Sequence, residues 1–180
     1  MNNAQIGSYV DNYSDEYLEI EEFEENASYV MVSYAHADKH RVWSLMKKMQ
    51  PDFRIWCDIG IEEGEEWAEV VAKHIKESSC VIVFLSPLAV KSQVVREEIY
   101  YSKYLKKNMV IVYLDRCELT PGMQMRIGHL QSIHGYSVPE AVLLKRISSA
   151  KKMQSSRKNA SPDFLHISTQ DARSGEGELV

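Results

Sequence analysis

Apolar residues along the middle of the chain follow two alternating patterns. Short, nearly continuous apolar runs predict buried strands, and longer segments with apolar residues every three or four positions predict helices. The expected strands are Tyr29–Ser33, Phe53–Cys57, Cys80–Leu85, Met109–Leu114 and Gln131–Tyr136. The expected helices are Asp38–Met49, Glu65–Ser78, Ser92–Lys106 and a last one from about Pro139 to Ile147.

Strands that alternate with helices predict β-α-β units and a parallel sheet, which makes this an α/β protein. The strands are apolar on both faces, as expected for a sheet covered by helices on each side. We therefore predict a flavodoxin-like three-layer fold with five parallel strands in the order 2-1-3-4-5. Ligands bind such sheets beyond the carboxyl ends of the strands where the order reverses. That point lies between the loop Tyr34-Ala35-His36 and the loop that begins at Ser86.

The two flanks have a different composition from the middle. Residues 1–27 form an acidic arm that we expect to be flexible, since 11–25 hold eight acidic residues and no lysine or arginine. Aromatic residues are interleaved there, so docking on a partner or on the domain itself is an alternative. We predict one domain over residues 28–148 and a flexible polar tail over 149–180. Neither flank shows a periodic apolar face, so deletion before Ser28 or after Ala150 is expected to cost little stability.

Composition narrows the class of protein. Hydrophobic residues make up 44% of the 180 positions and charged residues 26%, as in ordinary globular proteins. The net charge of -5 argues against nucleic-acid binding. No apolar run approaches the roughly 20 residues that span a bilayer, and no signal peptide begins the sequence, so we expect a cytoplasmic protein without a membrane partner. Cys57, Cys80 and Cys117 are widely spaced and odd in number, which indicates free thiols.

Several familiar site motifs are missing from the sequence. It has no GxGxxG turn, no GxxxxGK[ST] phosphate loop and no GxSxG nucleophile elbow. A phospho-receiver domain needs an aspartate at the end of the third strand, where this chain has Leu85 and Ser86. His36 and His40 are four residues apart, but Ala37 stands where the HExxH motif has glutamate. No metal site is expected.

Glu98 is the most informative acidic residue in the middle of the chain. In the helix that follows Ser92, Val95 and Ile99 face the sheet, and a helical repeat places Glu98 at the edge of that face. Glu97 points to solvent. A carboxylate at the edge of a core is costly unless it is paired or used. It could pair with a neighbour such as Lys91 or Ser102, or it could serve a function.

Three stretches in series resemble the TIR (toll/interleukin-1 receptor) domain family. They are "YVMVSYAHAD", "RIWCDIGIEEGEEWAEVVAKHIKESSCVIVFLSPLAVKS" and "VVREEI", and the resemblance extends over about 29–136. The later stretch "LTPGMQMRIGHLQSIHGY" is similar to stand-alone microbial members. The resemblance implies the five-stranded flavodoxin-like fold expected above.

The resemblance also implies a function. Members of the family are adaptors that self-assemble or enzymes that cleave NAD+ at the nicotinamide–ribose bond. The enzymes carry a pattern like S-x-x-x-x-x-S-x-W-[CV]-x-x-E, which here aligns Ser86, Ser92, Val94, Val95 and Glu98. Glu98 would be the catalytic residue, while Val94 replaces the usual tryptophan, which bears on how the nicotinamide ring is held. By the same resemblance, Tyr34, Ala35, His36, Glu62 and Ser86 would lie at the nucleotide.

The resulting expectation is a cytoplasmic NAD+ hydrolase or cyclase that needs no cofactor and self-associates through the loop 58–64. Its product would be ADP-ribose or a cyclic ADP-ribose isomer. Such a nucleotide could act in bacterial antiphage immune signalling through a downstream effector that senses it. The main alternative is a non-enzymatic scaffold that works through TIR–TIR contacts, and a third is a secreted bacterial effector that mimics host adaptors.

Overall fold

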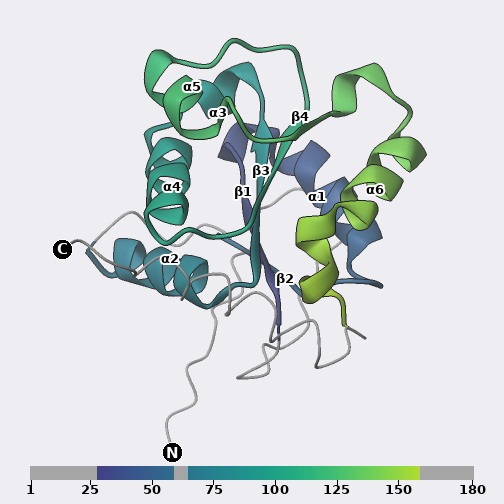
Figure 1. Cartoon of the computed structure of the whole chain (residues 1–180), viewed down its shortest axis with the longest axis horizontal. Coiled ribbons are helices and arrows are strands. Elements are labelled where there is room, and N and C mark those ends of the chain that lie inside the picture. Colours follow the sequence, from purple (N-terminus) through teal and green to yellow (C-terminus); the bar gives the residue numbers. More distant parts are fainter. Residues whose placement is uncertain (1–27, 59–64, 159–180) are drawn as a thin grey trace, which may run out of the picture.

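A five-stranded parallel sheet forms the centre of the molecule (Figure 1). The computed structural model describes residues 28–58 and 65–158. Its strands run in the order β2-β1-β3-β4-β5, and every neighbouring pair is parallel. This order confirms the fold class predicted from the sequence. The strands are β1 (Val30–Ser33), β2 (Ile55–Cys57), β3 (Cys80–Leu85), β4 (Met109–Tyr113) and β5 (Ser132–His134).

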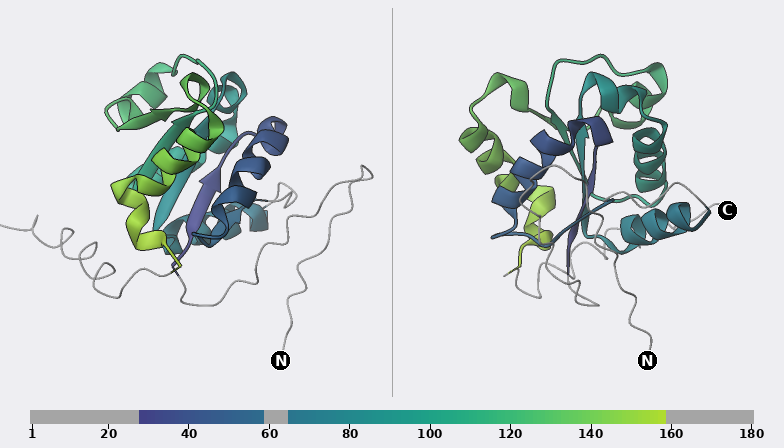
Figure 2. Two further views of the ribbon diagram at one scale, coloured as in Figure 1. Left: turned by 90° about the vertical axis from the view of Figure 1, so that its right-hand side faces the viewer. Right: turned by 180° about the vertical axis from the view of Figure 1, so that it is seen from behind.

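Helices cover both faces of this sheet (Figures 1 and 2). One face packs against α1 (Lys39–Met49) and α6 (Glu140–Ser149). The other packs against α2 (Glu65–Glu77), α3 (Pro87–Lys91), α4 (Gln93–Tyr104) and α5 (Pro121–Ile127). Three 3-10 turns complete the described chain: η1 (His36–Asp38), η2 (Gly135–Ser137) and η3 (Lys151–Ser156).

Strands β1 to β4 contribute side chains to both layers because successive residues point to opposite faces. In β1, Val30 and Val32 pack in the α1/α6 core, whereas Met31 packs in the α2/α4 core. Ser33 follows Met31 by two positions and therefore faces the α2/α4 layer. A polar side chain thus ends a fully buried strand on the face that carries α4.

Two short helices were not predicted from the sequence. Both begin with a hydroxyl cap and a proline: Ser86 caps α3 before Pro87, and Thr120 caps α5 before Pro121. The hydroxyl accepts bonds from free backbone N–H groups, and proline suits the first helical position. At 5 and 7 residues, these helices are too short to show a helical repeat. The Ser-Pro and Thr-Pro pairs were the signals available.

Packed residues continue beyond residue 148, where we expect the polar tail to start. The turn η3 follows α6 closely, and its Met153 is 0% exposed in the α1/α6 core. Lys152 Nζ donates to the carbonyl of Met109 at 3.0 Å, and Arg157 forms an antiparallel bridge with Phe53. A single apolar anchor in a polar stretch leaves no periodic pattern, so the sequence did not indicate this packing. Residues 1–27 and 159–180 lie outside the described part.

The thiols behave as predicted. All three cysteines are free, Cys57 and Cys80 are buried, and Cys117 is partly exposed. Burial raises the pKa of both buried thiols to about 12, so they stay protonated. Within the described ranges, no helix combines the length and apolarity needed to cross a bilayer.

Candidate functional site

Glu98 meets the carboxyl end of β1 from the neighbouring helix layer. Ser33, the last residue of β1, is paired with Val83 of β3, and its Oγ donates a hydrogen bond to Glu98 Oε2 at 2.5 Å. Glu98 is 5% exposed, whereas Glu97 is exposed and accepts a bond from Gln93. The predicted helix register is therefore confirmed. The hydrogen-bond partner is Ser33 rather than Lys91 or Ser102, and Ser102 Oγ has no partner among the described residues.

The environment of Glu98 favours its neutral form. Burial raises the pKa of its carboxyl to about 8, and the negative charges of Asp58 and Glu97 add to the rise. The hydrogen bond from Ser33 acts in the opposite direction because it stabilises the carboxylate. A carboxyl with a strongly raised pKa, placed where strand order reverses, is typical of a functional group in this kind of sheet.

Asp58 is a second buried carboxylate beside this position. It follows β2 directly and is 6% exposed. Trp67 Nε1 in α2 donates to Asp58 Oδ2 at 2.7 Å, and His36 Nε2 lies 3.8 Å from the same oxygen. Asp58 therefore connects the end of β2 to the start of α2 and to the loop after β1. The negative charge of Asp58 also contributes to the raised pKa of the Glu98 carboxyl.

Tyr34 supports the loop after β1 from the other side of the sheet. Its ring is 6% exposed in the α1/α6 core. Its hydroxyl accepts a bond from Trp43 Nε1 at 3.0 Å and approaches the carbonyl oxygen of Asp58 at 3.5 Å. Burial raises the pKa of this phenol well above its usual range, so it remains neutral. Tyr34 thus positions the chain that carries Ala35 and His36.

Ser86 and Asp38 join the loops that follow β1 and β3. Ser86 is 0% exposed, caps α3 through the N–H groups of Leu88 and Ala89, and donates to Asp38 Oδ2 at 2.5 Å. Asp38 is 6% exposed, and its Oδ1 lies 3.9 Å from Arg41 Nη1. These contacts hold the two loops that border the strand-order reversal in one arrangement.

The structure brings most of the predicted site residues to the same end of the sheet. Glu98 is buried against Ser33, Ala35 is 7% exposed, and the side chain of His36 is 61% exposed at the rim. Tyr34 and Ser86 lie beneath the surface, with their hydroxyls bonded within the protein. Glu62 lies outside the described residues.

Four side chains of this region were not among the predicted site residues. Each is a polar or indole group near the carboxyl end of a strand or the adjoining helix, and they are Ser33, Asp38, Asp58 and Trp67. The available signal was positional. Carboxyl ends of neighbouring parallel strands share one edge of a sheet, so a polar residue that ends a buried strand can contact residues far away in the sequence.

A separate hollow lies on the other face of the sheet, between α1 and α6. It has a volume of about 600 Å³, and its walls include His40, Arg41, Leu114 and Tyr136. Arg41 is held there by Asp115, with Nη1 at 2.7 Å from Oδ2 and Nη2 at 3.1 Å from Oδ1. This hollow does not contain Glu98. Among the described residues, no group of three or more potential metal ligands is present.

Because the pKa of Glu98 is raised in the folded domain, the free energy of unfolding should depend on pH. Between about pH 4.5 and 8 the unfolded chain has released this proton while the folded domain retains it, so stability should fall as the pH rises through that window. Glu98→Gln keeps the neutral shape and removes the titration. Relative to this variant, the unmodified protein should lose about 3–5 kcal/mol of unfolding free energy between pH 5 and pH 9.

Urea denaturation at pH 5, 7 and 9 measures this effect. Glu97→Gln serves as the matched control, because Glu97 is exposed on the same helix. Its pH profile should stay close to that of the unmodified protein, because Glu97 makes the smallest of the contributions to the raised pKa of Glu98. Parallel profiles for all three proteins would show that Glu98 titrates as an ordinary carboxyl.

Two solved structures of TIR domains are similar to this chain. The TIR domain of the Toll-related receptor TRR-2 from Hydra magnipapillata is 22% identical over 58% of this chain and 81% of its own, with a TM-score of 0.46. The TIR domains of the activated Roq1 resistosome, which directly recognises the pathogen effector XopQ, are 16% identical. They cover 71% of this chain and 74% of their own, with a TM-score of 0.42.

The sequence finds no match among curated proteins. The family profile described as TIR domain matches residues 30–141, which is more than half of the chain and runs from β1 into α6. The matched region includes Ser33, Asp58 and Glu98. The chain therefore belongs to the TIR domain family.

Proposed function

We propose that this TIR domain cleaves NAD+ at the nicotinamide–ribose bond, with Glu98 as the catalytic residue. The observation that carries the proposal is the position of Glu98, a buried carboxyl bonded to Ser33 at the carboxyl end of β1. Strand order reverses at this point, and open α/β sheets bind their ligands there. The family contains such enzymes, and their characteristic glutamate aligns with Glu98.

One carboxylate is sufficient for this chemistry. The bond between the anomeric carbon and the pyridinium nitrogen breaks, and its electron pair neutralises the leaving nicotinamide, so no general acid is needed. The ribose that remains has oxocarbenium character, as in glycoside hydrolysis. Glu98 as a carboxylate would stabilise that positive charge and orient the ribose hydroxyls. Water or an adenine nitrogen then attacks the anomeric carbon. The cation formed in either case releases one proton, which yields ADP-ribose or a cyclic product.

The pKa of Glu98 is compatible with this role. With a pKa of about 8, the carboxyl of the free protein is mostly protonated at neutral pH. A cationic nicotinamide ring nearby favours the charged carboxylate, so substrate binding would itself promote the active form. His36 stands exposed at the rim, where it and the backbone of Ala35 would border the nucleotide.

Incubation of the purified protein with NAD+, followed by mass spectrometry, tests the proposal. Nicotinamide should appear together with ADP-ribose or with a product one water lighter. The second candidate function is a non-enzymatic TIR scaffold. In such a protein, a protonated Glu98 bonded to Ser33 would have a structural role only. Absence of nicotinamide at every protein concentration would favour the scaffold.

Self-association through residues 58–64 is the second part of the proposal. In the family this loop docks on a neighbouring TIR domain, which helps to close the NAD+ pocket. Apart from Asp58, the loop lies outside the described residues. In enzymes of this type, exclusion of water from the reacting ribose requires a cover, and a second copy would supply it. Specific activity should therefore rise with protein concentration.

Dilution over a hundredfold range, with light scattering in parallel, measures this dependence. Gly64→Pro should lower both assembly and turnover, because proline restricts the backbone that glycine leaves free. Gly122 in α5 does not belong to the loop, and a methyl group there would meet only the end of the Arg126 side chain, so Gly122→Ala serves as a folding control. Constant specific activity with a monomer at all concentrations would contradict this part.

A further inference from the structure

The net charge of -5 is the sum of a positively charged domain and negatively charged flanking segments. Residues 28–158 contain 20 lysine and arginine residues against 14 aspartate and glutamate residues, a formal charge of +6. Residues 1–27 contain eight acidic residues and no basic one, a charge of -8. The C-terminal residues 159–180 are less charged, with four acidic residues and Arg173. The acidic arm therefore precedes a domain of opposite charge.

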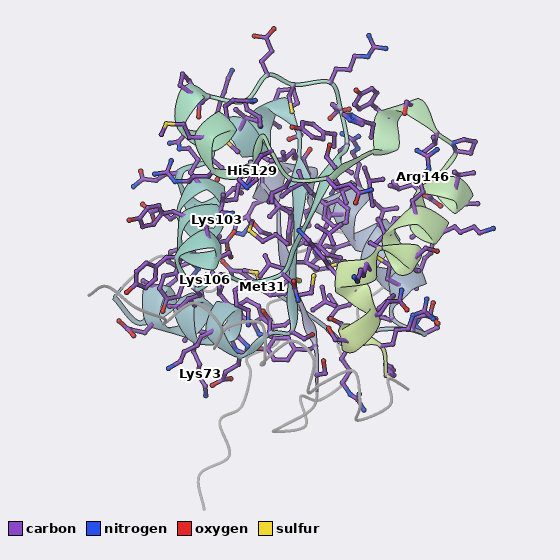
Figure 3. The ribbon with its side chains drawn as sticks, in the orientation of Figure 1. Met31, Lys73, Lys103, Lys106, His129 and Arg146 are labelled. Atoms are coloured by element: carbon purple, nitrogen blue, oxygen red, sulfur yellow. The ribbon has the colours of Figure 1, made fainter. Side chains whose placement is uncertain are left out.

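Part of the positive charge lies along one side of the domain. Figure 3 shows His129, Lys103, Lys106 and Lys73 one below the other from α5 along α4 to α2. Lys103 Nζ lies 3.5 Å from His129 Nε2, and Lys73 and Lys106 are exposed. Arg146 lies on the opposite side of the molecule, on α6. The same helices also carry exposed acidic residues: Glu69 and Glu77 in α2, four positions before and after Lys73, and Glu97 in α4.

Exposed aromatic and apolar side chains accompany these cations. Tyr100 and Tyr104 of α4 are 56% and 73% exposed, and Met125 of α5 is 82% exposed. The guanidinium of Arg126 lies 4.9 Å from the ring of Tyr100. We call this surface the α4 strip, and its residues are Lys73, Tyr100, Lys103, Tyr104, Lys106, Met125, Arg126 and His129. A ligand that suits it is negatively charged and carries aromatic or aliphatic side chains.

The acidic arm joins the domain at Ser28, close to the end of the α4 strip that holds Lys73 and Lys106. The carbonyl of Tyr29 accepts a bond from Ser79 Oγ at 2.8 Å, and the neighbouring Ser78 carbonyl accepts one from Lys107 Nζ. Ser28 therefore lies near the turn that follows α4. Glu25 is three residues away from it, within about 10 Å of extended chain. The 12-residue helix α4 is about 18 Å long, so residues 11–25 can reach the whole strip.

We propose that the acidic segment 11–25 of this chain is the ligand of the α4 strip and docks on it within the same molecule. Its carboxylates would lie against Lys73, Lys103 and Lys106. Its aromatic residues Tyr13, Tyr17 and Phe23 would pack on Tyr100 and Tyr104. The short tether raises the local concentration of the segment, so weak screened contacts are enough for docking.

Zero-length carbodiimide cross-linking of the full chain tests this contact. The reagent joins a carboxylate to a lysine amine only where the two touch. Peptide mapping by mass spectrometry should show 19–25 joined to Lys73, Lys103 and Lys106, with yields that fall severalfold in 0.5 M NaCl. Lys151 serves as a control for cross-linking that results from the short tether alone. It is exposed and lies in η3, and η3 is close to the start of the domain because the Ser155 carbonyl accepts a bond from Ser28 Oγ at 2.8 Å. It should be joined severalfold less.

Two paired charge reversals sharpen the test. The double variant Lys103→Glu and Lys106→Glu should reduce the cross-links that remain at Lys73, whereas Lys145→Glu and Arg146→Glu on α6 should leave them unchanged. Mixing unlabelled and 15N-labelled chains separates docking within one molecule from docking between two. Equal yields at Lys151 and at the strip, an unchanged yield at Lys73 in the first variant, or mainly mixed-isotope products would each overturn the proposal.

Discussion

Glu98→Ala should abolish nicotinamide release from NAD+ while the domain stays folded. Removal of the carboxylate that we propose stabilises the ribose cation should lower kcat by at least about a hundredfold, the usual cost of losing a preorganised electrostatic group. The fold should survive, because the lost contact is one hydrogen bond to Ser33 and the carboxyl itself is costly to bury. Nicotinamide release measured by chromatography and far-UV circular dichroism report the two quantities separately.

Glu97→Ala is the matched control for this variant. Glu97 precedes Glu98 on the same helix but is exposed and bonded to Gln93. Its replacement should leave kcat within a few-fold of the unmodified protein. An inactive Glu97→Ala beside an active Glu98→Ala would mean that the other face of α4 carries the chemistry.

Met153→Ala should destabilise the domain by about 2–5 kcal/mol. Met153 is 0% exposed and packs in the α1/α6 core from a turn beyond the last helix. Its replacement leaves a cavity that a core shared by several elements cannot close. Truncation after Ala150 removes Met153 together with the Lys152 contact to Met109, so its effect should be at least as large. Urea denaturation of both proteins measures the loss.

Met125→Ala provides the comparison at an exposed site. Met125 is 82% exposed, and surface substitutions of this kind usually change the unfolding free energy by less than about 0.5 kcal/mol. Equal effects of Met153→Ala and Met125→Ala would show that η3 does not contribute to the core in solution.

The sequence was sufficient to predict the order of the elements, the parallel sheet and the facing of Glu98. Each depends on local periodicity: strands such as Cys80–Leu85 are apolar throughout, and α4 repeats its buried residues at the helical period. The prediction that Glu98 lies at the edge of the core face and Glu97 in solvent follows from this repeat alone. The missed α3 and α5 were too short to repeat, although their Ser-Pro and Thr-Pro starts were visible.

The partners of the site residues were decided only by the tertiary structure. Ser33 and Glu98 are 65 positions apart, and Ser86 and Asp38 are 48 apart, so no local pattern relates them. They meet because the strand order places β1 beside β3 and brings their carboxyl ends to one edge. The burial of Met153 has the same origin. A single apolar side chain carries no period, and only the space between α6 and the sheet makes it part of the core.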